Sequence, residues 1–565
     1  MRPPGLVLKL CLLVIFSAEC CQCQSTCAFM KQTPYDLRNM PDEPQIAQNL
    51  THCPFNGLYS CCTPKIEAEM EGFARQKIEQ FVQSHVVTMR GTLDEFARIF
   101  RNHFRDALRS TERQLDRMFQ QTYGSFYRDN AKVFADFFDE IDEQFAVDDS
   151  SASLKSALGS LFRKVFLTEF SLMNPMRDVS NAERHCMARL QSQLKPFGQI
   201  PAKLAIILER MFLGWKFVTS SLEKASELLI RISDKMVLQK ECVSKLIAMR
   251  QCHVCSGAGP EAKPCMGYCL NVLNGCFAEI AEIEPQWTGL MGTLQLLSNR
   301  LKSASNAYHV LAPIPIQISE AIMLFQERGN TISNRILFQC FEPTLRFKRN
   351  AEENVLTDRP IVMNSETSAN NVNWLSESLD RLYRKGDALK KDMARFNDRL
   401  ILMKGAWRLL PTAICADGQV AQGSEEQCWN GQTVGSYRKP VVPSGIFHQK
   451  NNPEFRDMQM NLSKATFIDE RMTLHSLRVQ LLNIYDGKAA KASEVEASGL
   501  EELNPNPDDE DSFEGSAYSN CDDNTNQALE DVKIQLLEQK WKSASGHLAP
   551  LISTAISLFI LLRWH

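Results

Sequence analysis

The sequence predicts an all-α protein with an elongated, disulfide-stapled helical core. Apolar residues recur every three or four positions over long stretches, and alternating strand patterns are scarce. The chain also has nineteen cysteines in 565 residues, many of them between these stretches. Because long helices that pack side by side make a long bundle, we expect an elongated molecule.

Three stretches carry an apolar stripe with the spacing of one helix face. The third helix should end before Pro411, because proline cannot continue the hydrogen-bond ladder. We interpret the aromatic and methionine residues of the stripes as core. The stripes are Leu93, Phe96, Phe100, Phe104, Leu108, Leu115 and Phe119; Leu204, Ile207, Leu208, Met211, Trp215, Val218 and Leu222; and Leu375, Leu379, Leu382, Leu389, Met393, Phe396, Leu400, Met403 and Trp407.

Residues 1–23 have the layout of a secretory signal peptide. Arg2 precedes a short apolar run from Leu6 to Phe16, and small residues follow. The run is too short to span a bilayer, and an ordinary buried helix is the alternative. We expect cleavage after Cys20 or Cys23, and therefore export of the chain.

The four cysteines between Cys252 and Cys269 admit two interpretations. Their spacing, Cys252-x2-Cys255 and Cys265-x3-Cys269, is that of two pairs of zinc ligands. Export favours disulfides, because thiols oxidise in the secretory pathway. After cleavage at Cys23, fifteen cysteines remain; fourteen of them can pair, and Cys521 is left over. The fourteen are Cys27, Cys53, Cys61, Cys62, Cys186, Cys242, Cys252, Cys255, Cys265, Cys269, Cys276, Cys340, Cys415 and Cys428.

Composition and motifs limit the function classes. With 44% hydrophobic residues and a net charge of −4, the chain suits one large domain or two fused lobes, and it is no polycation that seeks nucleic acid. The sequence has no H-E-x-x-H, no G-x-S-x-G and no phosphate-binding glycine loop, and its ten histidines show no metal-ligand spacing. We therefore expect no enzyme, no cofactor and no metal site. A secreted hydrolase with an unrecognised site is a less favoured alternative.

Three cysteine motifs resemble those of the glypicans, which are cell-surface heparan sulfate proteoglycans. They are the string from Lys263 to Cys276 (KPCMGYCLNVLNGC), the doublet Cys61-Cys62, and Cys428-Trp-Asn-Gly431. The resemblance covers the chain from about Cys27 to about Leu482, and its Cys265 segment is more similar to the Dally-type branch than to the other one. It predicts a helical glypican core over residues 24–484.

The resemblance also implies a disulfide connectivity that spacing alone does not select. The implied pairs are Cys27–Cys61, Cys53–Cys252, Cys62–Cys255, Cys186–Cys340, Cys242–Cys276, Cys265–Cys428 and Cys269–Cys415. In this pattern the four cysteines between Cys252 and Cys269 go to four distant partners. No tetrahedral metal site can then form there.

A loop near residues 346–373 is a candidate for proteolytic processing. Arg346-Phe-Lys-Arg349 fits the acidic substrate cleft of furin-like convertases, and an asparagine-rich polar run follows it. A solvated basic cluster is the alternative. We expect cleavage to give two subunits that the cysteines keep joined.

Residues 485–547 are expected to form a disordered acidic stalk. No Lys or Arg lies between Lys491 and Lys533, and such a segment cannot bury enough apolar surface to fold. The spacing required of an acidic calcium loop is not met. Ser498-Gly499 has acids on both sides and is the candidate for glycosaminoglycan attachment. Glypican stalks commonly carry several Ser-Gly repeats, whereas this one offers a single good site.

The C-terminus has the layout of a glycosylphosphatidylinositol (GPI) attachment signal. The small residues Ser543, Ala544 and Ser545 are the candidate attachment points, and the apolar tail 548–565 would be removed. A transmembrane helix is the alternative, but the tail is too short to span a bilayer comfortably. Two sequons, at Asn49 and Asn461, predict N-glycans.

This layout predicts a proteoglycan held in the outer leaflet of the plasma membrane, and also shed to the extracellular space. Its sulfated chains would attract basic faces of secreted proteins. The resemblance implies heparin-binding growth factors and morphogens of the Wnt, Hedgehog, bone morphogenetic protein (BMP) and fibroblast growth factor (FGF) classes as partners. The alternative is a protein-only receptor whose helical core binds a ligand or its lipid without glycosaminoglycan.

Overall fold

The computed structural model describes most of the chain up to Lys488. The described residues are Cys27, 39–46, 49–53, 59–147, 154–256, 258–259, 261–341, 368–418, 420–422, 427–458 and 460–488. All of them belong to the first of two units of the chain, Met1–Ser498. The predicted signal peptide, anchor signal and convertase sequence lie outside the described residues, and so does the predicted stalk from residue 489 onward; its first residue, Tyr485, is the last residue of α16.

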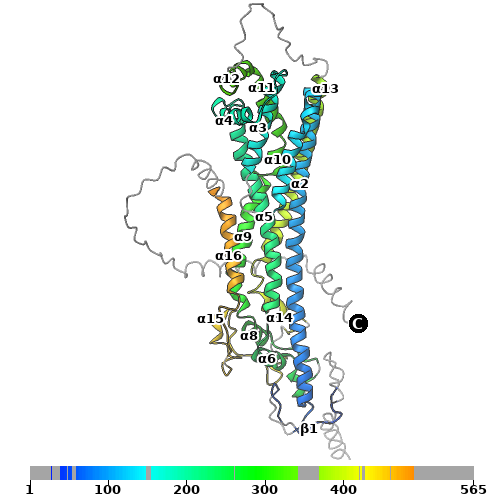
Figure 1. Cartoon of the computed structure of the whole chain (residues 1–565). Helices are drawn as coiled ribbons and strands as arrows, with labels where there is room; N and C mark the ends of the chain where they lie inside the picture. Colours follow the sequence, from blue (N-terminus) through cyan, green and yellow to red (C-terminus); the bar gives the residue numbers. More distant parts are fainter. Residues whose placement is uncertain are drawn as a thin grey trace, which may run out of the picture. The chain divides into compact units, whose positions relative to one another are not determined.

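The described part is almost entirely helical, as predicted (Figure 1). One short antiparallel pair of strands, which the sequence analysis did not predict, joins Gln45–Ile46 to Tyr59–Ser60. In chain order the elements are β1 (Gln45–Ile46), β2 (Tyr59–Ser60), α2 (Pro64–Ala146), α3 (Leu154–Met173), α4 (Asn181–Leu194), α5 (Ile200–Lys235), α6 (Lys240–Arg250), α7 (Cys252–Cys255), α8 (Met266–Cys276), the 3-10 helix η2 (Ile280–Ile283), α9 (Glu284–Lys302), α10 (Ala307–Leu311), α11 (Ile314–Glu327), α12 (Gly329–Cys340), α13 (Ser368–Met403), α14 (Leu410–Cys415), α15 (Ile446–Gln449) and α16 (Ile468–Tyr485).

Helix α2 is a helical hairpin. The Thr63 hydroxyl caps its start by accepting from the Ile66 N–H, and the backbone reverses at Gly124, where φ is 58° and ψ is −123°. The two arms run antiparallel and contact each other: Arg105 Nε of the first arm donates to Asp142 Oδ1 of the second arm over 2.7 Å. The first arm holds about 60 residues and is therefore roughly 90 Å long. Its length makes this unit elongated.

The other long helices pack along this arm and along one another. Helix α5 lies against α2, and α9 contacts both α13 and α16 (Figure 1). The predicted stripes form the core between them: the Phe100 ring meets the Trp215 and Phe396 rings edge to face, with centroids 6.2 and 5.0 Å apart. The prediction of core packing is confirmed for most of each stripe, although Ile207 is half exposed.

The third predicted helix ends earlier than the apolar stripe suggests. Helix α13 stops at Met403, and Trp407 is buried in the turn that follows. Pro411 lies in the first turn of α14, where its missing N–H costs nothing. Among the described residues no single helix is long and apolar enough to cross a membrane; the bent pair Ile280–Leu311 and Ile314–Glu327 meets that criterion by length and composition only.

Seven disulfides staple the helices. Their Cα–Cα distances lie between 4.8 and 5.9 Å, within the usual range. The pairs are Cys27–Cys61, Cys53–Cys252, Cys62–Cys255, Cys186–Cys340, Cys242–Cys276, Cys265–Cys428 and Cys269–Cys415, the connectivity that the family resemblance implied. The zinc interpretation is therefore wrong, because each of the four cysteines is bonded to a distant partner.

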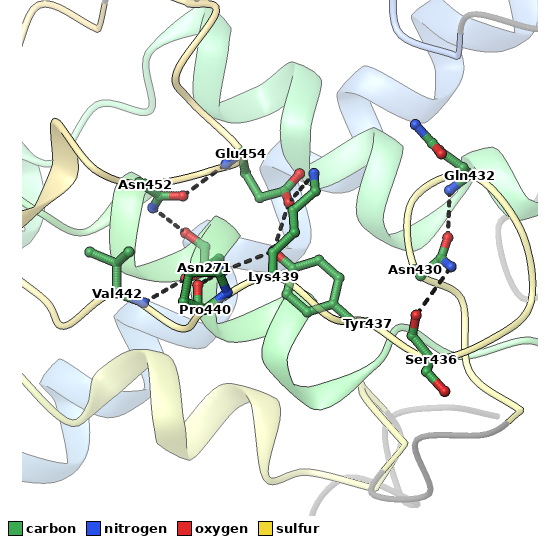
Figure 2. A network of polar contacts seen from close by, with 10 residues as sticks. All are labelled: Asn271, Asn430, Gln432, Ser436, Tyr437, Lys439, Pro440, Val442, Asn452 and Glu454. Carbon is green, nitrogen blue, oxygen red and sulfur yellow. Dashed lines mark hydrogen bonds and ion pairs between the residues drawn. The ribbon is translucent and has the colours of Figure 1, made fainter.

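Polar contacts fix the irregular segment 427–458 onto α8 (Figure 2). Asn271 is fully buried; its Nδ2 donates to the Tyr437 hydroxyl and to Pro440 O, and its Oδ1 accepts from Val442 N. Tyr437 in turn donates to Glu454 Oε1 over 2.7 Å. Buried polar groups that satisfy one another in this way define one position for a segment with few apolar residues.

Candidate functional site

The hairpin tip of α2, together with α3 and α11, encloses an apolar pocket of about 600 Å³. The reversal at Gly124 builds one wall, because it brings the Phe119 and Phe134 rings together, with their centroids 5.1 Å apart. Val165 of α3 and Ile322 of α11 complete the lining. Such a volume is typical of a ligand site.

Three large apolar side chains are exposed around this apolar pocket. Phe126, Leu172 and Met323 line it and are 55%, 41% and 45% exposed. Apolar side chains that gather at a hollow mark a binding surface more often than scattered ones do. The opening therefore suits an apolar ligand.

The apolar pocket also has polar lining residues, and several of them hydrogen bond to protein groups. The Tyr123 hydroxyl lies 2.9 Å from Ser319 Oγ, and Tyr127 donates to Asp116 Oδ1 over 3.0 Å. Burial raises the pKa of both phenols and of the Glu169 carboxyl, which accepts from Gln326 Nε2. No serine or cysteine lines the apolar pocket, and the described residues contain no group of three His, Cys, Asp or Glu side chains placed to hold a metal ion. The arrangement is suited to binding.

The predicted N-glycan acceptors are accessible side chains. Asn49 is exposed, with a φ of 58°, and its loop is fixed because Glu67 accepts from the backbone N–H groups of Thr51 and Cys53. Asn461 is exposed as well. Glycans at either position stay predictions, and so do the roles of Ser498, Arg346, Arg349, Ser543, Ala544 and Ser545, which lie outside the described residues.

The sequence analysis did not find the apolar pocket. Its lining comes from three segments, near residues 119–134, 165–173 and 322–330, and Phe119 was assigned to core. One usable signal was present: Gly124 interrupts an aromatic-rich stretch, Tyr123 to Tyr127, in the middle of a long amphipathic run.

The described part is a disulfide-stapled helical body with an apolar pocket, which is the architecture of a binding protein. The chain belongs to the glypican family, because the family model described as "Glypican" matches residues 16–551. Glypicans are core proteins of cell-surface heparan sulfate proteoglycans and are not enzymes.

Curated relatives agree with this family. The chain is similar to glypican-1 of Gallus gallus, with 28% identity over 421 residues that cover 74% of this chain and 72% of the relative. It is 25% identical to glypican-2 of Mus musculus over 439 residues, 76% of this chain and 73% of the relative.

Solved structures agree with the fold. A C-terminally truncated glypican-1 matches with a TM-score of 0.66 and 22% identity, covering 82% of this chain and 99% of that one. The Dally-like protein in complex with O-palmitoleoyl serine matches with a TM-score of 0.60 and 26% identity. The match covers 82% of this chain and 100% of that one.

Proposed function

We propose that this glypican is a GPI-anchored heparan sulfate proteoglycan that acts as a co-receptor and regulator of secreted growth factor and morphogen signalling. The observation that carries the proposal is the extent of the family match, which continues to residue 551 and so includes Ser498 and the residues from Ser543 to Ser545. The expected partners are heparin-binding proteins of the Wnt, Hedgehog, BMP and FGF classes.

The mechanism is electrostatic capture near a membrane. Sulfated chains on Ser498 would attract basic faces of secreted proteins, raise their local concentration and hand them to receptors. Capture must weaken as salt rises, because screening acts over about 8 Å at physiological ionic strength. The helical body would serve as a rigid support and the predicted stalk as a spacer.

Heparan lyase digestion tests the glycan. The wild type should run as a broad, high-mass smear that collapses to a sharp band on digestion, whereas Ser498→Ala should run as the sharp band from the start. Ser516→Ala is the matched control, because Ser516 precedes Ala517 rather than glycine in the same acidic segment. A wild-type band that the lyase leaves unchanged would contradict the proposal.

Phospholipase release tests the anchor. A phosphatidylinositol-specific phospholipase C should free the protein from the cell surface. Replacement of Ser543, Ala544 and Ser545 by leucine should abolish surface display, since the attachment reaction requires small residues. Surface protein that resists the phospholipase would support a transmembrane helix instead.

The apolar pocket favours a second candidate function, in which the helical core itself binds a lipid carried by a ligand. Its volume of about 600 Å³ and its exposed apolar rim suit an acyl chain, and the similar Dally-like protein has been solved with O-palmitoleoyl serine. If the protein carries no glycosaminoglycan at all, this second function makes it a protein-only receptor, and the predicted stalk serves only as a spacer.

Binding of O-palmitoleoyl serine to the Ser498→Ala protein tests this second function. Leu172→Asp places a charge on the rim of the apolar pocket and should weaken binding at least tenfold, because burying an unpaired charge is costly. Val87→Asp makes the same change at an exposed position outside the apolar pocket and should leave affinity unchanged. Equal affinity of the two variants would exclude the apolar pocket.

A further inference from the structure

A second cavity, of about 550 Å³, lies along α9 between α13 and α16. We call it the α9 trough and define it by Gly289, Gly292, Asn299, Asn397, Lys404 and Arg478. Seven of its eleven lining residues carry hydroxyl, amide or cationic side chains, and none is aromatic. Nothing in the proposed function uses it.

Two cations line the α9 trough, and no carboxylate does. Arg478 makes no ion pair within the described ranges, and Lys404 Nζ is held by Gln295 Oε1 at 2.5 Å. The nearest acid along α9, Glu284, is occupied by the backbone N–H groups of Gly405 and Trp407. The guanidinium of Arg478 therefore brings positive charge to the α9 trough, and no carboxylate in its lining neutralises that charge.

The glycine at position 289 makes room for the guanidinium. A Cβ added at Gly289 would lie only 2.9 Å from Arg478 Nη1, so any larger residue there must displace the arginine head group. A Cβ added at Gly292 would lie 4.0 Å from Lys404 Nζ. The helix face thus allows both cations to lie close to the floor of the α9 trough.

Two buried polar atoms of the α9 trough lack a protein partner. Arg478 Nε, a donor, and Asn397 Oδ1, an acceptor, make no hydrogen bond to any described residue. Buried polar groups are usually satisfied, by protein, water or a ligand. A simple oxyanion can accept from Nε but has nothing to donate to Oδ1. A sugar that bears both an acidic group and hydroxyls satisfies both atoms.

We propose that the α9 trough binds a sulfated segment of an acidic polysaccharide. Its volume exceeds the needs of one sulfate group, and its amide side chains can bond sugar hydroxyls. The proposal rests on the proposed function, because that function supplies a sulfated polysaccharide attached to this protein. Ser498 lies ten residues beyond Lys488, the last described residue after α16, so an attached polysaccharide begins within about 35 Å of Lys488. Binding would hold the polysaccharide against the body.

The test uses the mature chain carrying Ser498→Ala and a size-defined heparin tetrasaccharide as the probe, measured by calorimetry at low and at physiological salt. Lys404→Gln combined with Arg478→Gln should weaken binding roughly 100-fold, because two charge-assisted hydrogen bonds are lost. Gly289→Ala leaves the charge unchanged and should weaken binding about tenfold, because the new Cβ displaces the guanidinium.

Lys391→Gln combined with Arg399→Gln is the control, since it removes the same charge from exposed positions of α13 outside the α9 trough. It should change affinity by less than about twofold at physiological salt. The proposal is overturned if the parent does not bind the tetrasaccharide, if the control weakens binding as much as the double variant, or if inorganic sulfate binds and the tetrasaccharide does not.

The glycanated wild type separates the two sources of polysaccharide. If the polysaccharide attached at Ser498 occupies the α9 trough, the wild type binds the probe more weakly than Ser498→Ala does. If the two proteins bind the probe equally, the α9 trough binds polysaccharides that belong to other molecules. Both outcomes support the site. If the lyase finds no glycan on the wild type, the proposed function fails, but the measurement on Ser498→Ala still decides whether the α9 trough binds the tetrasaccharide.

Discussion

At the residue scale, a chain of polar side chains joins three helices that are distant in sequence. Tyr308 of α10 donates to Asp106 Oδ2 of α2 over 2.9 Å, and Lys385 Nζ of α13 contacts the same oxygen at 2.7 Å. His103 lies 3.1 Å from the Tyr308 hydroxyl and 2.8 Å from Asp392 Oδ2. This network ties α13 to the N-terminal helices without a covalent bond.

Asp106→Asn should destabilise the protein at neutral pH and not in acid. Burial by itself would raise the pKa of Asp106, but hydrogen bonds from Lys385 and Tyr308, with the charges of Lys385 and Arg113, lower it below its ordinary value. A carboxyl whose pKa is lowered by folding contributes stability above its unfolded pKa, and this contribution is lost as the pH falls through the folded pKa.

Thermal unfolding of wild type and Asp106→Asn across pH 7 to about pH 2 checks this prediction. The difference in melting temperature should be largest near neutrality and should shrink toward zero in acid. Asp94→Asn, at an exposed position of the same helix, is the control. A difference that stays constant with pH would show that lost packing, not charge, causes the effect.

Glu284→Gln should destabilise the turn after α13. The buried carboxylate accepts from Gly405 N and Trp407 N, at 2.8 and 2.9 Å, and one oxygen faces each. An amide has a single acceptor, so its NH2 group would face an N–H donor. We expect a loss of about 1–3 kcal/mol in the free energy of unfolding. Exposed Glu227→Gln should stay within about 0.5 kcal/mol of wild type, and denaturant titration measures both.

At the element scale, the reversal of α2 depends on one residue. The backbone of Gly124, at φ 58° and ψ −123°, is in a region that residues with a Cβ rarely adopt. Because no other atom lies within 4 Å of an added Cβ, strain and not a clash decides the effect of a substitution there. Loss of the reversal would separate Phe119 from Phe134 and open the apolar pocket.

Gly124→Ala should therefore lower the free energy of unfolding by about 1–3 kcal/mol. Gly91→Ala provides a control of opposite sign: Gly91 lies in the first arm of α2 with open space around its Cα, so alanine should stabilise the helix by up to about 1 kcal/mol. Denaturant unfolding of both variants distinguishes them. If both changes stabilise the protein, the turn does not require glycine.

The helices themselves were predictable, and their ends were not. The stripes around Phe100, Trp215 and Phe396 all lie in long helices, because a period of 3.6 residues is a local property of the chain. The hairpin turn at Gly124 was missed because the apolar spacing continues on both sides of it. Trp407 continues the spacing of α13 although it lies beyond the helix, since the turn is set by contacts with Glu284.

At the scale of the whole molecule, cavities could not be predicted from one sequence. The apolar pocket combines side chains from four helices and the α9 trough from three, and tertiary packing alone brings them together. The pairing of cysteines was predictable only through the family motifs around Cys61, Cys265 and Cys428. Spacing gives no partner for Cys53, which bonds Cys252 across 199 residues.

The distribution of the disulfides predicts the outcome of convertase cleavage after Arg349. Five of the seven bonds join cysteines up to Cys340, and only Cys265–Cys428 and Cys269–Cys415 connect that part to later residues. Cleaved protein should therefore stay one species in a denaturing gel without reductant. With reductant it should separate into two chains.

The experiment uses the Ser498→Ala background, so that both chains run as sharp bands, and Arg349→Ala as the uncleavable control. Cys265→Ser with Cys428→Ser removes one link and should leave the non-reduced species intact, because Cys269–Cys415 remains. Two chains that separate without reductant in the parent would show that the bonds across the cleavage point do not form. A single chain under reducing conditions would show instead that Arg346-Phe-Lys-Arg349 is not cleaved.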